Sequence, residues 1–230
     1  MAMPDFLSGG VHIATDLYKP TGVANKSAII LAYGSDGLID NKNGPWATMI
    51  GEYAGELAQK GFHALVPDYF LRTGTPANSI DYQRGGALEV MKHKDEWQST
   101  IADAVQYAKT LPGIDSSRIG LLGYSLGAYL SLRLRAHAKA MVAFFPPWMD
   151  GIGPGTTPGL PVQIHYGDKD FLEFASNTGP IEQELRKNRA AVTLHCYPGA
   201  NHGFSGSDPA NASARTKSKA RTIQFFEASL

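Results

Sequence analysis

The chain has almost no cysteine and no long apolar run, and these two absences limit what it can be. Cys196 is the one cysteine among 230 residues, so no internal disulfide can form and no oxidising compartment is implied. The longest apolar runs, such as residues 28–33, are far shorter than the roughly 20 residues that a membrane-spanning helix needs. The first six residues resemble no secretory signal. We therefore expect a cytoplasmic protein that does not associate with membranes.

The chain also lacks net charge. Lysine plus arginine and aspartate plus glutamate each total 21, so nothing favours nucleic acid or an anionic membrane as a partner. Hydrophobic residues make up 43% and charged residues 18%, as in an ordinary globular protein. We expect a single domain over residues 1–230. Either a monomer or a homodimer fits this composition.

Strand-like and helix-like segments alternate along the chain, which predicts an α/β fold with a mostly parallel central sheet and helices on both faces. Residues 71–93 are rich in glycine and proline turns, and we expect them to be irregular and to form part of a site's rim. Strands are expected at residues 11–17 (an edge strand), 27–33, 62–66, 118–123, 140–145, 161–166 and 191–197. Helices are expected at residues 46–60, 100–111, 126–137, 177–188 and 210–228.

Residues 123–127 read Gly-Tyr-Ser-Leu-Gly and match the G-x-S-x-G motif. The motif lies between an expected strand and an expected helix, a setting typical of a nucleophilic serine on a sharp turn. The two glycines let strand and helix approach closely, and the helix N-terminus favours negative charge. Ser125 is therefore the predicted nucleophile. The alternative, a serine that only caps the helix, would not need both glycines.

A serine nucleophile needs a base, and His202 is the one histidine of seven in a loop directly after an expected strand. An acid that orients this base is expected in residues 166–170, Tyr-Gly-Asp-Lys-Asp, at another strand end. Asp168 and Asp170 compete for that role. Asp170 is favoured, because Asp168 in the turn itself more readily bonds its own backbone. By contrast, His12 and His63 are expected to pack in or near the core.

Two backbone amides are predicted to bind the developing oxyanion, those of Leu126 and of Ser35 in the loop 34–37. A simple turn is an equally good interpretation of that loop. Aromatic residues near these strand ends are candidate walls of a substrate pocket, although each is equally well explained as a core residue. They are Tyr33, Tyr69, Phe70, Tyr124, Trp148 and Phe204.

Four segments together resemble the dienelactone hydrolase family, and the resemblance covers nearly the whole chain. They are Val-Pro-Asp-Tyr-Phe-Leu-Arg at 66–72, Arg-Ile-Gly-Leu-Leu-Gly-Tyr-Ser at 118–125, Gly-Asp-Lys-Asp at 167–170 and Tyr-Pro-Gly-Ala-Asn-His-Gly-Phe at 197–204. The resemblance implies an α/β-hydrolase fold without a large lid domain. It also supports Asp170 over Asp168.

The chain departs from the family members that open dienelactones. Those enzymes carry a cysteine nucleophile where this chain has Ser125, and a glutamate where it has Gly34 or Ser35. They also hold the substrate carboxylate with an arginine shortly after the catalytic histidine, where this chain has Ser-Gly-Ser at 205–207. Arg72, within the first matching segment, and Arg84, a looser match to a second carboxylate-binding arginine, are candidate substrate-binding residues. Cys196, within a strand, is expected in the core.

These features predict a serine carboxylesterase that needs no metal or organic cofactor. The expected substrate is a small-molecule ester or lactone whose parts are small to medium and apolar or aromatic. Lactone hydrolysis of the dienelactone type is one alternative, and acyl transfer to another acceptor or peptide cleavage is a second. A non-catalytic binding protein with a hydrolase fold is the alternative from a different class.

Overall fold

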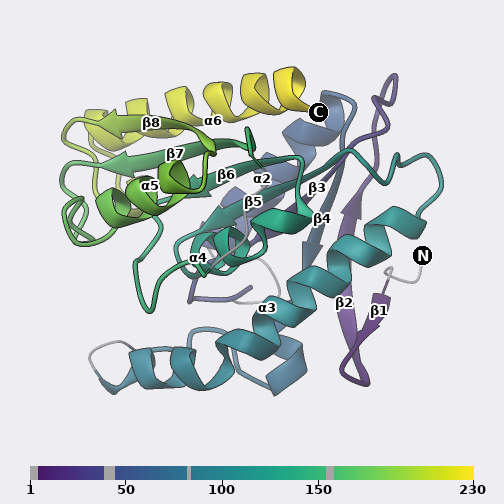
Figure 1. The fold of residues 1–230 in the computed structure, drawn as a ribbon, viewed down its shortest axis with the longest axis horizontal. Coiled ribbons are helices and arrows are strands. Elements are labelled where there is room, and N and C mark those ends of the chain that lie inside the picture. The colour runs from purple at the N-terminus through teal and green to yellow at the C-terminus, as the bar shows by residue number, and fades with distance from the viewer. Residues whose placement is uncertain (1–4, 39–44, 82–83, 154–157) are drawn as a thin grey trace. The chain divides into compact units, whose positions relative to one another are not determined.

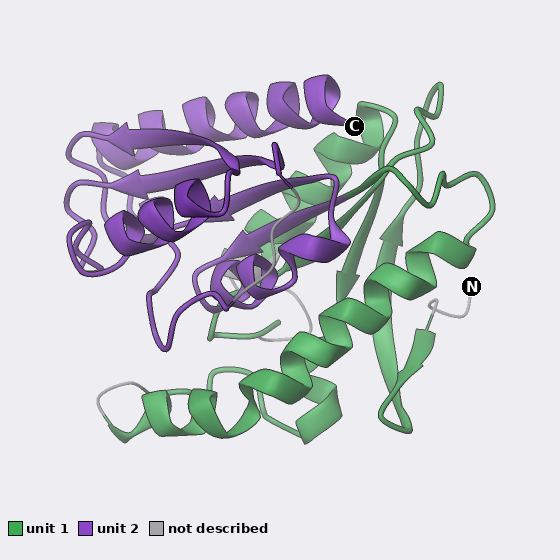
Figure 2. Ribbon diagram, viewed as in Figure 1, with its two compact units in different colours: residues 1–119 green, residues 120–230 purple. Residues whose placement is uncertain are grey.

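The computed structural model describes residues 5–38, 45–81, 84–153 and 158–230, which group into two compact units (Figures 1 and 2). Unit 1 comprises residues 1–119 and unit 2 residues 120–230. A single domain over residues 1–230 stays a prediction. Within the described residues, no helix is both long enough and apolar enough to cross a membrane.

Unit 1 contains two antiparallel strand pairs and one parallel pair, in the order β1-β2-β4-β3. β1 pairs with β2 and β2 with β4 in antiparallel fashion, whereas β3 and β4 are parallel. The elements are β1 (Asp5–Ser8), β2 (Val11–Tyr18), β3 (Ala28–Ala32), α2 (Pro45–Gln59), β4 (His63–Pro67), the 3-10 helix η1 (Tyr69–Thr73) and α3 (Gly86–Thr110).

Continuous apolar runs form the centre of unit 1. Every residue of β3 and β4 is buried, as expected for parallel strands that are covered on both faces. α2 contacts β4 and β2, and α3 contacts β3 and β4. These contacts explain why neither strand shows the alternation of polar and apolar residues typical of a half-exposed sheet.

Two predictions for unit 1 are wrong. β2 is not an edge strand, because β1 pairs with it along Asp5–Ser8. Residues 86–93 are not irregular but form the first turns of α3, which begins 14 residues before the predicted start. Gly85 adopts φ 91° at the helix start. The buried face of these first turns contains Val90, Lys94 and Trp97. Glycines that mark a helix boundary were interpreted as signs of a loop.

Unit 2 is built on four parallel strands in the order β5-β6-β7-β8. α6 contacts β6, β7 and β8, while α4 contacts β6 and α5 contacts β8. The elements are β5 (Ile119–Tyr124), α4 (Leu126–Arg133), η3 (Arg135–His137), β6 (Ala140–Phe144), β7 (Pro161–Gly167), α5 (Thr178–Lys187), β8 (Ala191–Tyr197), η4 (His202–Phe204) and α6 (Pro209–Ser229). Apart from the break between α4 and η3, these bounds match the predicted segments closely.

A buried polar network links β7 to β8. The Tyr197 hydroxyl lies 2.8 Å from His165 Nδ1, and His165 Nε2 lies 2.9 Å from Gln163 Oε1. The Gln163 amide nitrogen lies 3.1 Å from His195 Nε2. Burial lowers the pKa of His165 well below its usual value, so this ring is neutral inside the unit. A neutral ring both accepts and donates, which satisfies both of its nitrogens.

The predicted burial of single side chains is confirmed for one residue and wrong for two. His63 is buried as expected, but His12 is exposed on β2 and forms an ion pair with Asp5, so its placement near the core is wrong. Cys196 lies in a strand as predicted, yet it is exposed and not a core residue. β8 is the last strand in the order of its sheet, and its burial does not alternate regularly: Ala191, Thr193 and Cys196 are exposed, whereas Val192 and Tyr197 are buried.

Candidate active site

Ser125 lies on a sharp turn between β5 and α4 in unit 2. Its backbone adopts φ 49° and ψ −115°, a conformation that non-glycine residues rarely adopt and that costs of order 1–3 kcal/mol. The turn requires Gly123, because a Cβ there would lie only 2.4 Å from the Gly127 carbonyl oxygen. The Ser125 side chain makes no capping hydrogen bond to α4. The hydroxyl is therefore held by the turn but not used by the helix.

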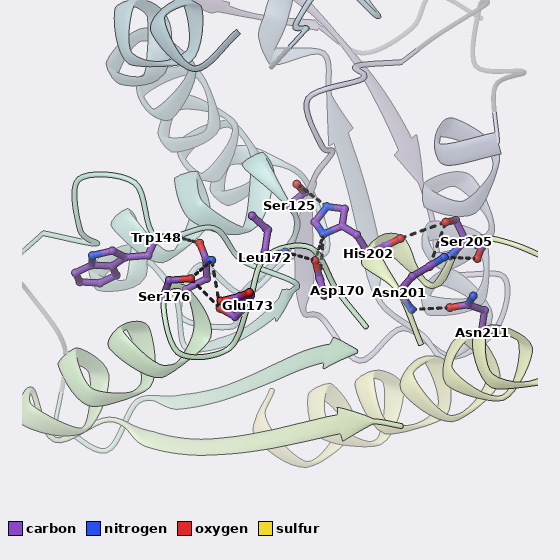
Figure 3. Close-up of polar contacts among 11 residues, drawn as sticks. Ser125, Trp148, Asp170, Leu172, Glu173, Ser176, Asn201, His202, Ser205 and Asn211 are labelled. Carbon is purple, nitrogen blue, oxygen red and sulfur yellow. Dashed lines mark hydrogen bonds and ion pairs between the residues drawn. The ribbon is translucent and has the colours of Figure 1, made fainter. Parts of the chain in front are cut away.

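The Ser125 hydroxyl lies against His202. Ser125 Oγ is 3.1 Å from His202 Nε2, and the two residues are 77 positions apart in the chain (Figure 3). His202 begins the short 3-10 helix η4, which residues 198–201 connect to the end of β8, in agreement with the prediction that it follows a strand. The imidazole is mostly buried, with 19% of its side chain exposed. One ring nitrogen thus faces the serine and the other faces into unit 2.

Asp170 holds the inner nitrogen of the imidazole. His202 Nδ1 lies 2.9 Å from Asp170 Oδ1 and 3.0 Å from Oδ2. The carboxylate is almost completely buried and also accepts a hydrogen bond from the Leu172 amide at 2.8 Å. An ionised carboxylate can only accept, so Nδ1 carries the proton and Nε2 is left as the acceptor for the serine hydroxyl.

Asp168, the competing acid, has a different place. Its side chain is exposed, and Asp168 Oδ1 accepts a hydrogen bond from the Gly199 amide at 2.6 Å. The two loops also meet where the Lys169 amide donates to the Ala200 carbonyl at 3.0 Å. A Cβ on Gly167 would lie 2.0 Å from that same carbonyl oxygen, so only glycine permits this approach. Asp168 and Gly167 bring the loop of Asp170 and the loop of His202 together.

The loop of His202 is also fastened to the start of α6. Asn201 Oδ1 accepts from the Ser205 amide at 2.8 Å, and Asn201 Nδ2 donates to the Ser205 carbonyl at 3.0 Å (Figure 3). The Asn201 amide in turn donates to Asn211 Oδ1 at 3.0 Å. Sequence reasoning missed this role of Asn201. An asparagine beside the histidine, four residues before a serine, was the available signal.

Two phenylalanines that sequence reasoning also missed lie against the imidazole of His202. The Phe145 ring centroid is 4.7 Å away and the Phe171 centroid is 4.5 Å away. Phe145 is buried, whereas Phe171 is 74% exposed. Both follow strand ends of a parallel sheet, where sites form, and that position was the signal.

The predicted oxyanion donors lie at a helix start and in a turn. Leu126 is the first residue of α4, where a backbone N–H has no acceptor within the helix. Ser35 is in unit 1, in a turn after β3 that the Gly37 amide closes onto the Gly34 carbonyl at 3.1 Å. Each residue's part in catalysis stays a prediction.

Three of the candidate pocket aromatics belong to a buried cluster in unit 1. Tyr33 and Tyr69 stack with ring centroids 4.1 Å apart, and Phe70 meets Tyr33 edge-on at 5.2 Å. Tyr33 donates its hydroxyl to Asp68 and accepts from the Phe70 amide. Burial raises the pKa of Tyr33 well above its usual value, which keeps that hydroxyl protonated. Their packing accounts for their burial without a substrate.

The other three aromatics lie in unit 2. Tyr124 stacks on Phe144 with centroids 4.9 Å apart, and Phe204 meets Phe145 edge-on at 5.5 Å. Both Tyr124 and Phe204 are buried. Trp148 is partly exposed, and its amide donates to Asn177 Oδ1 at 2.9 Å. Phe204 thus contacts Phe145, and Phe145 in turn contacts the imidazole of His202.

The two candidate arginines are both in unit 1. Arg72 donates to the Ser8 hydroxyl at 2.6 Å and lies 3.8 Å from the Asp103 carboxylate, so its guanidinium has partners within the unit. The Arg84 side chain is 88% exposed and makes a distant ion pair with Asp81 at 3.7 Å. A substrate-binding role for either arginine therefore stays a prediction.

Comparison with known proteins places this geometry in a family. A family model described as "Dienelactone hydrolase family" matches residues 13–230. The chain is 28% identical over 239 residues to a Synechocystis sp. protein, covering 96% of this chain and 93% of that one. It is also 28% identical to the carboxymethylenebutenolidase of Rhodococcus opacus, covering 76% of this chain and 73% of that one.

Solved structures agree on the fold. The dienelactone hydrolase-like promiscuous phosphotriesterase P91 from metagenomic libraries superposes with a TM-score of 0.75 at 19% identity, covering 98% of this chain and 96% of that one. At such low identity the likeness concerns the fold alone, and it confirms the predicted α/β-hydrolase fold without a large lid domain. With the family model matching nearly the whole sequence, the chain belongs to the dienelactone hydrolase family, a family of hydrolases.

Proposed function

We propose that this chain is a serine hydrolase that cleaves carboxylic esters of small to medium molecules. One observation carries the proposal: Asp170, His202 and Ser125 form a continuous hydrogen-bonded series that ends at the first turn of a helix. This arrangement of acid, base and nucleophile is the one that acyl transfer to water requires. Membership of a hydrolase family supports it.

The reaction follows from the direction of these hydrogen bonds. Ser125 Oγ attacks the ester carbonyl carbon while its proton moves to His202 Nε2. The carbonyl π electrons move to the oxygen and give a tetrahedral oxyanion. They then re-form the C=O bond as the C–O bond to the alcohol breaks and His202 Nε2 protonates the leaving oxygen, which leaves an acyl-enzyme. Water then repeats the attack on the acyl-enzyme, and Ser125 recovers its proton. Asp170 stabilises the imidazolium that forms twice in this cycle.

The oxyanion is assigned to backbone amides. The Leu126 amide, at the positive end of the α4 dipole, is the first donor. Mutational studies of comparable sites give about 3–4 kcal/mol of barrier for one donor.

Lactone hydrolysis is the second candidate function, and the Rhodococcus opacus relative named carboxymethylenebutenolidase favours it. The same attack on a carbonyl opens a lactone, with the alcohol tethered to the acyl group. An anionic lactone would need a cation to hold its carboxylate. Arg72 is already bound to Ser8 and Asp103, and Arg215 donates to the carbonyl oxygens of Phe204 and Gly206. The contacts of these two arginines favour neutral esters over anionic lactones, whereas the exposed Arg84 does not discriminate between the two.

The proposal is tested by labelling and turnover. A fluorophosphonate probe is expected to modify wild type at Ser125 and not the Ser125→Ala variant. p-Nitrophenyl esters of rising acyl length and a set of neutral and anionic lactones are then compared by kcat/KM. Absence of labelling together with no turnover of any ester or lactone would leave a non-catalytic binding protein as the better interpretation. Turnover of lactones without esters would select the second function.

A further inference from the structure

We propose that Phe171 binds the leaving group of the substrate and selects esters of neutral aromatic alcohols. This inference rests on the proposed function, because it assigns the leaving-group side of the same site. It concerns a residue of unit 2 alone, in the loop that follows β7.

The position of the leaving group is fixed by proton transfer. In the second half of acylation, His202 Nε2 gives its proton to the alcohol oxygen, so that oxygen must come within hydrogen-bond distance of Nε2. Nε2 is 3.1 Å from Ser125 Oγ, so the bound carbonyl carbon and the alcohol oxygen both lie next to the imidazole edge. The substituent on that oxygen therefore extends over whatever flanks the imidazole.

Among the described residues, the rings of Phe145 and Phe171 flank the imidazole, and of these two Phe171 is the exposed one. Phe145 is 4% exposed and packs against Tyr124, Phe144 and Phe204, so its area is already used within unit 2. Phe171 is 74% exposed, although its ring centroid lies 4.5 Å from the imidazole. A leaving group that lies beside Nε2 can cover Phe171 and cannot cover Phe145.

The backbone on both sides of Phe171 is held in place. Phe171 follows Asp170, whose carboxylate is fixed by His202 and by the amide of Leu172. The buried Asp170 carboxylate therefore holds the residues on both sides of Phe171, Asp170 itself and Leu172. An exposed aromatic ring on a fixed backbone can receive a partner ring without the entropic cost of ordering a mobile loop.

The charge of the loop indicates the charge of the ligand. Asp168 and Glu173 are exposed near Phe171, with Lys169 as the exposed cation of this segment. The exposed charge there is therefore negative overall, which disfavours an anionic leaving group. Aromatic rings pair edge-to-face or offset with a free energy that corresponds to about two- to tenfold in an equilibrium or rate. A neutral phenol or benzyl-type alcohol matches both the ring and the charge.

The test compares two esters with the same acyl group, phenyl acetate and 2,2,2-trifluoroethyl acetate. For each enzyme variant the ratio of kcat/KM values, aryl over alkyl, is measured. Dividing the ratio for a variant by that for wild type cancels the intrinsic reactivity of the esters. Phe171→Ala is expected to lower the aryl preference about two- to tenfold, with Phe171→Leu between the two.

Phe174→Ala serves as the matched control. Phe174 is an exposed phenylalanine of the same loop, 41% exposed, whose ring lies 5.1 Å from Tyr166. Its removal is expected to leave the aryl preference unchanged. Varying the acyl chain with phenol as the fixed leaving group should give the same profile in wild type and Phe171→Ala.

The possible results distinguish a failure of the role of Phe171 from a failure of the proposed hydrolase function. An unchanged aryl preference in Phe171→Ala, with Ser125-dependent hydrolysis intact, overturns the role of Phe171 alone. An equal loss on both esters means that Phe171 only supports the imidazole, and this also overturns the role. If wild type hydrolyses neither ester and Ser125 takes no fluorophosphonate, the proposed function and the inference fail together.

Discussion

Replacing Asp170 with asparagine tests the direction of every hydrogen bond in the proposed triad. Both carboxylate oxygens lie within 3.0 Å of His202 Nδ1, and Oδ1 also accepts from the Leu172 amide. In Asp170→Asn the amide oxygen is expected to stay with Leu172, so the NH₂ group takes the position of Oδ2. An NH₂ group opposite Nδ1 favours the imidazole tautomer that carries its proton on Nε2. That tautomer cannot accept the proton of Ser125.

The expected loss of activity is large, because the substitution disables the catalytic base but preserves the shape of the site. In well-studied triads the same substitution lowers kcat by about 10⁴, which corresponds to about 5.4 kcal/mol of barrier at 1.36 kcal/mol per tenfold. Because the Asp170 side chain is only 2% exposed, water cannot substitute for the carboxylate. We expect kcat/KM for p-nitrophenyl acetate to fall by about 10³–10⁴.

Asp168→Asn is the matched control for this experiment. Asp168 is two residues away and exposed, and an asparagine oxygen can still accept from the Gly199 amide. Its kcat/KM should remain close to the wild-type value, and thermal unfolding should show that both variants are folded. A folded Asp170→Asn enzyme with more than a tenth of wild-type activity would refute the assignment. So would a large loss in Asp168→Asn alone.

Three further predictions concern the framework of the site. Burial lowers the pKa of His165 well below its usual value, so the unfolded chain binds a proton that the folded chain excludes. Stability from this ring is present above pH ~6.5 and is lost on acidification by up to about 1.4 kcal/mol per pH unit. Urea unfolding of His165→Asn should show a shallower decline between pH 7 and 5, and an unchanged decline would contradict this. Gly167→Ala places a Cβ 2.0 Å from the Ala200 oxygen and should lower both the melting temperature and kcat, whereas normal activity would show that the two loops can separate freely. Asn201→Ala removes the hydrogen bonds to Ser205 and should lower kcat more than it raises KM, measured with a p-nitrophenyl ester, while a KM effect alone would argue against a positioning role.

Segments whose pattern is local and regular were predicted well. The runs that became β3 and β4 are apolar at every position, and burial on both faces is the consequence of that composition. The beginning of α3 was missed because Gly85 and Gly86 suggested a loop. In the folded chain Gly85 supplies a positive φ at the helix boundary, and Gly86 packs against Asp81, where a Cβ would lie 2.7 Å from the backbone. Gly85 thus serves a backbone conformation and Gly86 a close approach to a residue five positions earlier, and neither role is visible in the spacing of apolar residues.

The exposure of the Cys196 and Phe171 side chains could not be predicted from the sequence either. The exposed residues of β8 do not follow a strict two-residue alternation, so the periodicity of the sequence could not place Cys196 at the surface. An exposed phenylalanine runs against the usual expectation that such a residue is buried. Only the position of Phe171 beside the imidazole gives its exposure a meaning.

By itself, the sequence determined the α/β class and the turn at Ser125, because both depend on residues that are adjacent in the chain. The Gly-Tyr-Ser-Leu-Gly turn is governed by the close approach of a strand to the helix that follows it. The sequence favoured Asp170 as the acid, but only the tertiary structure brings its carboxylate to His202 and decides which rings flank the imidazole, because those partners are far apart in the chain. Asp170 and His202 are 32 positions apart and Ser125 and His202 are 77 apart. Contacts at such separations depend on how parallel strands place their carboxyl ends together, which the local pattern of each segment does not contain.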